Sequence, residues 1–259
     1  MNTVFALAGV VVKELYRRKD FYVLFVLTAV ITLVMGSVSF FNDAKIVRYV
    51  KEIALLLIWV SALVIAIGTT ARQIPAERES RTIFPLLAKP VTRAQVILGK
   101  FAGCWLACGL ALIVFYLFFG LVSASREHDW PLLNYVQALW LQWMMLGIVI
   151  AFVLLGSVVF AAPSSNATIA FVVVIGILLL GSHLNQVALQ QPEPLRTIVY
   201  ALYFLIPHLE WYDVRDFVIY EQHLPGWTDC GLATLYAAVY AALLLWATWL
   251  VFRRKPLSV

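Results

Sequence analysis

The sequence predicts an all-α membrane protein with six transmembrane helices. Of its 259 residues, 63% are hydrophobic and only 13% are charged, whereas about 25% of the residues in an ordinary soluble domain are charged. This composition argues against a water-soluble enzyme. The charges are also unevenly spread and leave five uncharged tracts, each long enough to cross a bilayer with about 20 residues: 21–42, 53–71, 101–125, 130–192 and 230–252.

The fourth tract must contain two crossings. As one helix, residues 130–192 would be about 94 Å long, which exceeds the thickness of a bilayer threefold. Residues 162–166 interrupt the tract with a proline and three polar residues that can cap a new helix. The six predicted spans are therefore 21–41, 53–71, 101–124, 137–161, 167–184 and 230–252.

The distribution of basic residues predicts the orientation of these spans. Thirteen of the 19 Lys and Arg residues fall on the side that holds both termini, and six fall on the other side. Both termini are thus expected in the cytoplasm, with the chain in the cytoplasmic (inner) membrane. The basic balance then reflects topology and contact with anionic membrane lipid, and no nucleic-acid binding is predicted. A cleaved signal peptide is the alternative for the first apolar run, but no Ala-x-Ala site follows it.

Residues 1–20 form a separate unit before the six-span domain, 21–259. Apolar side chains recur there at helical spacing, and basic side chains occupy the other side. This pattern predicts a cytoplasmic amphipathic helix in the headgroup layer. Its apolar face would hold Val4, Phe5, Ala8, Val11, Val12 and Leu15.

The connector between the second and third spans, residues 72–100, is longer than a simple link requires. A charged cluster is followed by an apolar cluster, a proline stop and a second apolar turn. This alternation predicts one or two short helices on the membrane, with a charged edge that faces the cytoplasm and docks a protein. A solvated loop is the alternative. On the opposite side, Leu195–Pro207 is apolar but too short to span, so a short re-entrant region is predicted before the last span.

The connector carries a resemblance to a known family. The sequence ERESRTIFPLLAKPVTR at 77–93, continued by ILGKF at 97–101, resembles the acidic, Thr, Leu-Leu, Pro, Arg and Leu-Gly-Lys-Phe pattern of ABC-2 type transporter permeases. It is particularly similar to the subgroup associated with maturation of multicopper enzymes. These permeases are the membrane halves of ATP-driven exporters, and the resemblance extends over nearly the whole chain.

The resemblance implies a coupling helix that sits in a groove of a separate ATPase subunit, which would bind ATP and Mg. Carried over by position, the charged contact edge would comprise Glu77, Arg78, Glu79, Arg81 and Thr82. The side chains that hold the element to the bundle would be Ile83, Phe84, Leu86 and Leu87. In this interpretation the chain forms the cargo path and is not itself an enzyme.

The absence of several motifs from the sequence agrees with a permease that relies on a separate ATPase subunit. No Gly-x-x-x-x-Gly-Lys-Ser/Thr phosphate loop occurs, and no catalytic, cofactor-binding or metal-binding residues are predicted in this chain. The span interiors hold no Asp, Glu, Lys or Arg, which argues against ion-coupled transport. Six spans are too few to enclose a path, so we expect pairing with a second copy or a related permease. The small residues Gly99, Gly103 and Ala107 allow close helix approach, either within one bundle or between copies.

Three other interpretations remain open at this stage. The outward His183, His208 and His223 suggest a permease or assembly factor for haem or copper-enzyme maturation, although their spacing matches no ligand pattern. A non-transporting membrane scaffold could recruit a cytoplasmic partner through the same connector. An intramembrane enzyme is the third. For a transporter, the uncharged aromatic spans suggest apolar or amphipathic cargo.

Overall fold

The computed structural model describes residues 2–17, 19–37, 43–79, 92–127, 132–190, 192–220 and 226–254. Within these ranges every regular element is helical, as the sequence predicts. The elements are α1 (Asn2–Arg17), α2 (Lys19–Ser37), α3 (Asp43–Thr70), α4 (Pro75–Glu79), α6 (Arg93–Glu127), α7 (Leu132–Val159), α8 (Pro163–Gln190), α9 (Leu195–Leu205), the 3-10 helix η1 (Leu209–Tyr212), α10 (Arg215–Ile219) and α11 (Trp227–Arg254).

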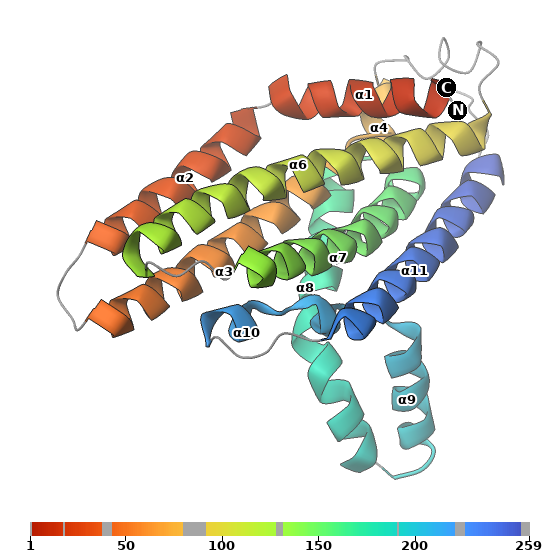
Figure 1. The fold of residues 1–259 in the computed structure, drawn as a ribbon. Helices are drawn as coiled ribbons and strands as arrows, with labels where there is room; N and C mark the ends of the chain where they lie inside the picture. The colour runs from red at the N-terminus through yellow and green to blue at the C-terminus, as the bar shows by residue number, and fades with distance from the viewer. Residues whose placement is uncertain are drawn as a thin grey trace.

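The long helices run back and forth between two ends of one bundle (Figure 1). We call the end of the bundle that holds α4 the connector end. It also holds α1, the start of α6, the last turns of α11 and both chain termini. The distal end holds η1, α10 and the first turns of α11. In this view α4 and both chain termini lie at the same end of the bundle, and the side of the membrane that this end faces stays a prediction.

Within the described ranges, four helices are long and apolar enough to cross a membrane. The qualifying segments are Arg48–Glu79, Arg93–Ala124, Leu132–Val159 and Trp227–Arg254, which cover the predicted second, third, fourth and sixth spans. The first and fifth predicted spans fall on α2 and α8, whose apolar helical segments, Phe21–Val34 and Pro163–Leu179, are shorter. Several helices begin earlier than the uncharged tracts, because charged residues at a membrane boundary can continue a helix.

The predicted break between the fourth and fifth spans is present. α7 ends at Val159 and α8 begins at Pro163, where proline suits the first helical position because its missing N–H needs no partner. α8 begins four residues before the predicted span at 167, so Asn166 lies within the helix. Its buried side chain donates from Nδ2 to the Val153 carbonyl oxygen at 3.1 Å and lies against Gly156. A polar residue expected to cap a helix thus joins α8 to α7.

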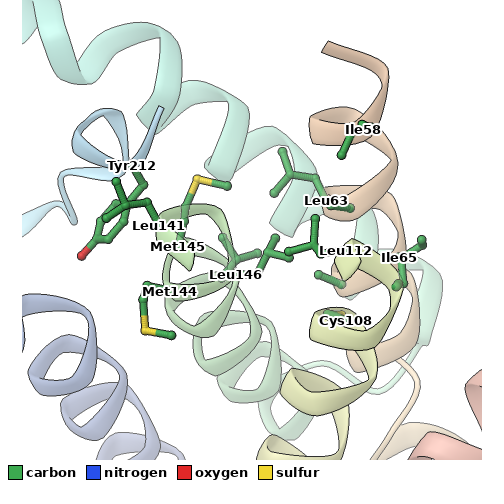
Figure 2. Close-up of a cluster of buried hydrophobic side chains, with 14 of the residues drawn as sticks. Ile58, Leu63, Ile65, Cys108, Leu112, Leu141, Met144, Met145, Leu146 and Tyr212 are labelled. Atoms are coloured by element: carbon green, nitrogen blue, oxygen red, sulfur yellow. The ribbon is translucent and has the colours of Figure 1, made fainter. Parts of the chain in front are cut away.

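The hydrophobic core is centred on α7. Figure 2 shows side chains of α3, α6 and α7 meeting there, with Tyr212 of η1 beside them. Leu112, Met145 and Leu146 are completely buried. By contrast, α11 packs on α7 and leaves much of its own surface apolar and exposed, including Leu232, Leu235 and Trp246. Such a surface is expected where lipid, rather than water, surrounds a helix.

Candidate functional site

α4 is anchored to the bundle by the residues that immediately precede it. Ile74 is 1% exposed and packs in a small cluster with Ile97 of α6, Leu154 of α7 and Phe252 of α11. The Ile74 carbonyl accepts the Arg78 N–H at 3.1 Å, which continues the turn into α4. One side chain therefore ties α4 to three helices. Ile74 lies between Gln73 and Pro75, outside any apolar run, so no local pattern in the sequence marks it.

An ion pair joins α4 to α6. The Lys100 ammonium contacts the Glu77 carboxylate, and these side chains are only 6% and 22% exposed. Glu77 therefore faces the bundle, whereas its assignment by resemblance placed it on an outward contact edge. Because both groups are largely removed from water, separating them would leave a poorly solvated charge.

The exposed surface of this element is made by other residues. Arg72, Ala76 and Glu79 are exposed, and Arg78 is partly buried. Of the predicted edge residues that the structure describes, Glu79 is the exposed one. The remaining predicted coupling residues, Arg81, Thr82, Ile83, Phe84, Leu86 and Leu87, lie outside the described residues, and their roles stay predictions.

The start of α6 is fixed by a capping box. The Thr92 N–H donates to Gln95 Oε1 at 2.9 Å, and the Gln95 N–H donates to Thr92 Oγ1 at 3.3 Å. This reciprocal pair satisfies two N–H groups that lack partners within the helix. The Thr-x-x-Gln spacing is a local signal from which this helix start could have been found.

Arg93 connects the start of α6 to the end of α11. Its Nη1 donates to the carbonyl oxygens of Phe252 at 2.5 Å and Arg253 at 3.0 Å, and its guanidinium lies 5.4 Å from the centre of the Phe252 ring. The last carbonyls of a helix lack intrahelical partners and carry partial negative charge, so a cation is stabilising there. The two helix ends therefore form one unit at the connector end.

α1 packs across the same part of α6 through two glycines. A Cβ atom at Gly99 would lie 2.8 Å from Leu7 Cβ, and one at Gly103 would lie 2.7 Å from Val11 Cβ and 3.0 Å from the Ala8 backbone. These distances are too short for real contacts, so only glycine allows the helices to approach this closely. The small residues at positions 99 and 103 thus allow α1 and α6 of one chain to pack closely.

One turn further along α6, two tryptophans join it to α7. Trp105 Nε1 donates to the Trp143 carbonyl at 3.1 Å, and Trp143 Nε1 donates to the Trp105 carbonyl at 2.9 Å. Their rings stack with centroids 4.4 Å apart. Gly109 leaves room for the Trp143 ring, since a Cβ there would lie 2.7 Å from it. We call this arrangement the tryptophan clamp; it joins α6 to α7 by two hydrogen bonds and a ring stack.

At the distal end, tyrosines hold the segment around η1 to α11. Tyr212 donates its hydroxyl to the Ala233 carbonyl at 2.7 Å, Tyr240 donates to the Leu205 carbonyl, and Tyr236 accepts the His208 N–H at 3.2 Å. The Tyr212 hydroxyl is a donor at neutral pH because the ordinary pKa of tyrosine is about 10, and burial raises this pKa further.

His208, one of the three outward histidines, packs between Tyr203 and Trp211 and faces Glu210 at 3.3 Å. Among the residues that the structure describes, no three His, Cys, Asp or Glu side chains are grouped to hold a metal ion. His223 lies outside the described residues.

Comparison with known families decides the class of protein. The family model described as ABC-2 family transporter protein matches residues 13–257, nearly the entire chain. The chain belongs to this family. It is therefore the membrane component of an ABC transporter, a multi-pass helical permease that is not normally catalytic itself, and membership implies association with an ABC ATPase subunit. No curated protein matches the sequence.

Proposed function

We propose that this ABC-2 permease is the cargo-conducting subunit of an exporter in the cytoplasmic membrane, with both termini in the cytoplasm. Residues 75–90 would couple it to a separate ATPase subunit, and two permease copies, or this chain and a related permease, would enclose the path. The observation that carries the proposal is the attachment of α4 to α6 by the Glu77–Lys100 ion pair.

The connector end has the mechanical properties that coupling requires. A force on the exposed Glu79 edge passes through α4 to Glu77 and Lys100, and thus directly into α6. Breaking a largely buried ion pair costs about 3–5 kcal/mol when one partner is removed. In this proposal the contact carries motion from α4 to α6.

The motion would continue beyond α6 by two routes. The tryptophan clamp links α6 to α7, and Arg93 links α6 to the end of α11. Three predicted spans would consequently respond together to one displacement of α4. A discrete element that joins two sites through packed contacts is the physical basis on which coupling can be claimed.

Charge favours the cytoplasmic placement of this end. The side that holds the termini and the connector carries 13 of the 19 Lys and Arg residues, as the positive-inside rule requires. The exposed Arg72 and Glu79 provide charges of both signs at α4. Such charges steer docking of a complementary partner and set its orientation.

Charge reversal tests the proposal. Glu79→Lys should weaken co-purification of the ATPase subunit and lower ATP-dependent transport. Asp216→Lys reverses an equally exposed carboxylate at the distal end and should change neither. If a variant that carries both Glu79→Lys and Glu77→Lys assembles and transports normally, this edge is not the coupling surface. Stimulation of the ATPase by cargo would further distinguish a transporter from a non-transporting scaffold.

A further inference from the structure

A groove runs along α7 and α11. It consists of three adjoining cavities of about 340, 410 and 440 Å³. Trp140 and Thr234 line both the first and the second, and Cys230 lines both the second and the third. The groove therefore extends from Phe101, near the connector end, to Trp211 at the distal end. It shares Trp105 with the tryptophan clamp, but none of its lining residues belongs to α4 or to the Glu77–Lys100 ion pair.

The first cavity, which we call the inner compartment, is almost purely apolar. One wall consists of the aromatic side chains Phe101, Trp105 and Trp140 of α6 and α7. The facing wall is a row of small side chains on α11: Ala237, Ala238, Ala241 and Ala242. Alanines opposite bulky rings leave space that a flexible hydrocarbon chain can fill from the bilayer.

The third cavity, the distal compartment, has a different chemistry. Trp211 and Tyr236 present rings with centroids 5.4 Å apart and tilted by 52°. The Asp229 carboxylate lines the same cavity, and none of its lining residues is basic. Aromatic faces carry partial negative charge and attract cations, especially beside a carboxylate.

The inner and distal compartments are joined by the second cavity, where Trp140 and Thr234 are hydrogen-bonded to each other. Trp140 Nε1 donates to Thr234 Oγ1 at 2.9 Å, and the same hydroxyl donates to the Cys230 carbonyl at 2.7 Å. The indole is therefore held at a fixed angle beside the groove. An elongated molecule could extend past it with its two ends in different compartments.

We propose that this groove binds an amphiphile with a single hydrocarbon chain and a cationic head. The chain would lie against the alanines of α11, and the head would contact Trp211, Tyr236 and Asp229. Charge complementarity selects this occupant, because an anionic head would meet a carboxylate and two electron-rich rings. The amphiphile would be cargo only if the exporter function proposed above holds. Its binding to the purified permease does not depend on that function.

Binding to the full chain in neutral detergent micelles tests the proposal without the ATPase. Tritiated dodecyltrimethylammonium is the probe, and unlabelled laurate and dodecanol are competitors with the same chain length and an anionic or uncharged head. We expect dodecyltrimethylammonium to bind about tenfold more tightly than either competitor. Equal affinity for all three heads would overturn the proposal.

Variants locate the site. Asp229→Asn keeps an oxygen to accept the Gly226 N–H, which Asp229 Oδ2 now accepts at 3.2 Å, and should lower affinity for the cation about tenfold without affecting dodecanol. Asp216→Asn is the matched control and should have no effect. Binding that is unchanged in Asp229→Asn would refute the assignment of the head.

A space-filling variant tests the groove itself. Gly231 lines the second cavity, and a Cβ atom there would meet nothing within 4 Å. Gly231→Phe should therefore fill the groove without disturbing α11 and abolish binding, while Gly231→Ala retains it. Undiminished binding in Gly231→Phe, or a loss of dimer in place of a loss of binding, would overturn the proposal. Because no ATPase is present, neither result depends on the coupling assignment.

Discussion

Gly103→Ala tests whether α1 is docked on α6. A Cβ at this position would lie 2.7 Å from Val11 Cβ and 3.0 Å from both Cα and the carbonyl oxygen of Ala8. The Ala8 atoms belong to the backbone of α1, so they can yield only if the whole helix moves. The substitution adds one methyl group and leaves charge unchanged, which restricts its effect to packing.

Two opposing contributions decide the result. Alanine favours a helix over glycine by up to about 1 kcal/mol. Overpacking costs about 1–3 kcal/mol, and a clash with backbone should lie in the upper part of that range. Gly103→Ala is therefore expected to destabilise the protein by about 1–2 kcal/mol. Gly120→Ala on the same helix meets nothing within 4 Å and should be neutral or stabilising.

Thermal unfolding of the purified permease in detergent, followed by tryptophan fluorescence, measures the difference. Because 1 kcal/mol shifts Tm by about 2–4 °C in a chain of this size, the two variants should differ by about 2–12 °C. Trypsin should also cleave Gly103→Ala faster at Lys13, which is exposed on α1. Equal or higher stability of Gly103→Ala would refute the close packing of α1 on α6.

Three further predictions concern the links between helices. Trp105→Phe removes one of two reciprocal hydrogen bonds and leaves the Trp143 carbonyl without that donor, so Tm should fall by an amount corresponding to about 1 kcal/mol. Arg93→Gln removes charged hydrogen bonds to the last carbonyls of α11, so amide exchange in that turn should accelerate by about tenfold or more. Glu77→Gln should preserve assembly with the ATPase but lower transport per ATP hydrolysed, and exchanging the charges at Glu77 and Lys100 should restore part of it.

Each of these has a distinct contradicting result. Unchanged Tm in Trp105→Phe would mean that the clamp contributes no stability. Exchange that accelerates throughout the chain in Arg93→Gln would indicate global unfolding in place of a local effect. A normal transport ratio in Glu77→Gln would show that force reaches the spans by a route other than α6.

The helices themselves were predictable because the bilayer imposes a simple constraint. A crossing needs about 20 uncharged residues, and the tracts that met this condition coincide with α2, α3, α6, α7, α8 and α11. Among the described residues, α3, α6, α7 and α11 have the length and apolarity of a span, whereas the apolar segments of α2 and α8 are shorter. The proline and polar residues at 162–166 correctly marked a helix end. The role of Asn166 was not predictable, because a polar side chain can cap its own helix or bond to another, and only packing decides between them.

The contacts of the candidate site were largely beyond sequence reasoning. Glu77 and Lys100 are 23 positions apart, and Arg93 and Phe252 are 159 positions apart, so no local period relates them. The spacing of Gly99 and Gly103 correctly indicated a close approach, but it could not identify α1 as the partner. The Thr92–Gln95 capping box, by contrast, was readable from four residues.

The most direct test of the coupling proposal is to determine on which side of the membrane α4 lies. A cysteine introduced as Glu79→Cys would be the exposed thiol among the described residues, since Cys104, Cys108 and Cys230 are buried. An impermeant maleimide should label it only after the cells are permeabilised, and a bifunctional reagent should then crosslink it to the ATPase subunit. Labelling of this cysteine in intact cells would contradict the proposal.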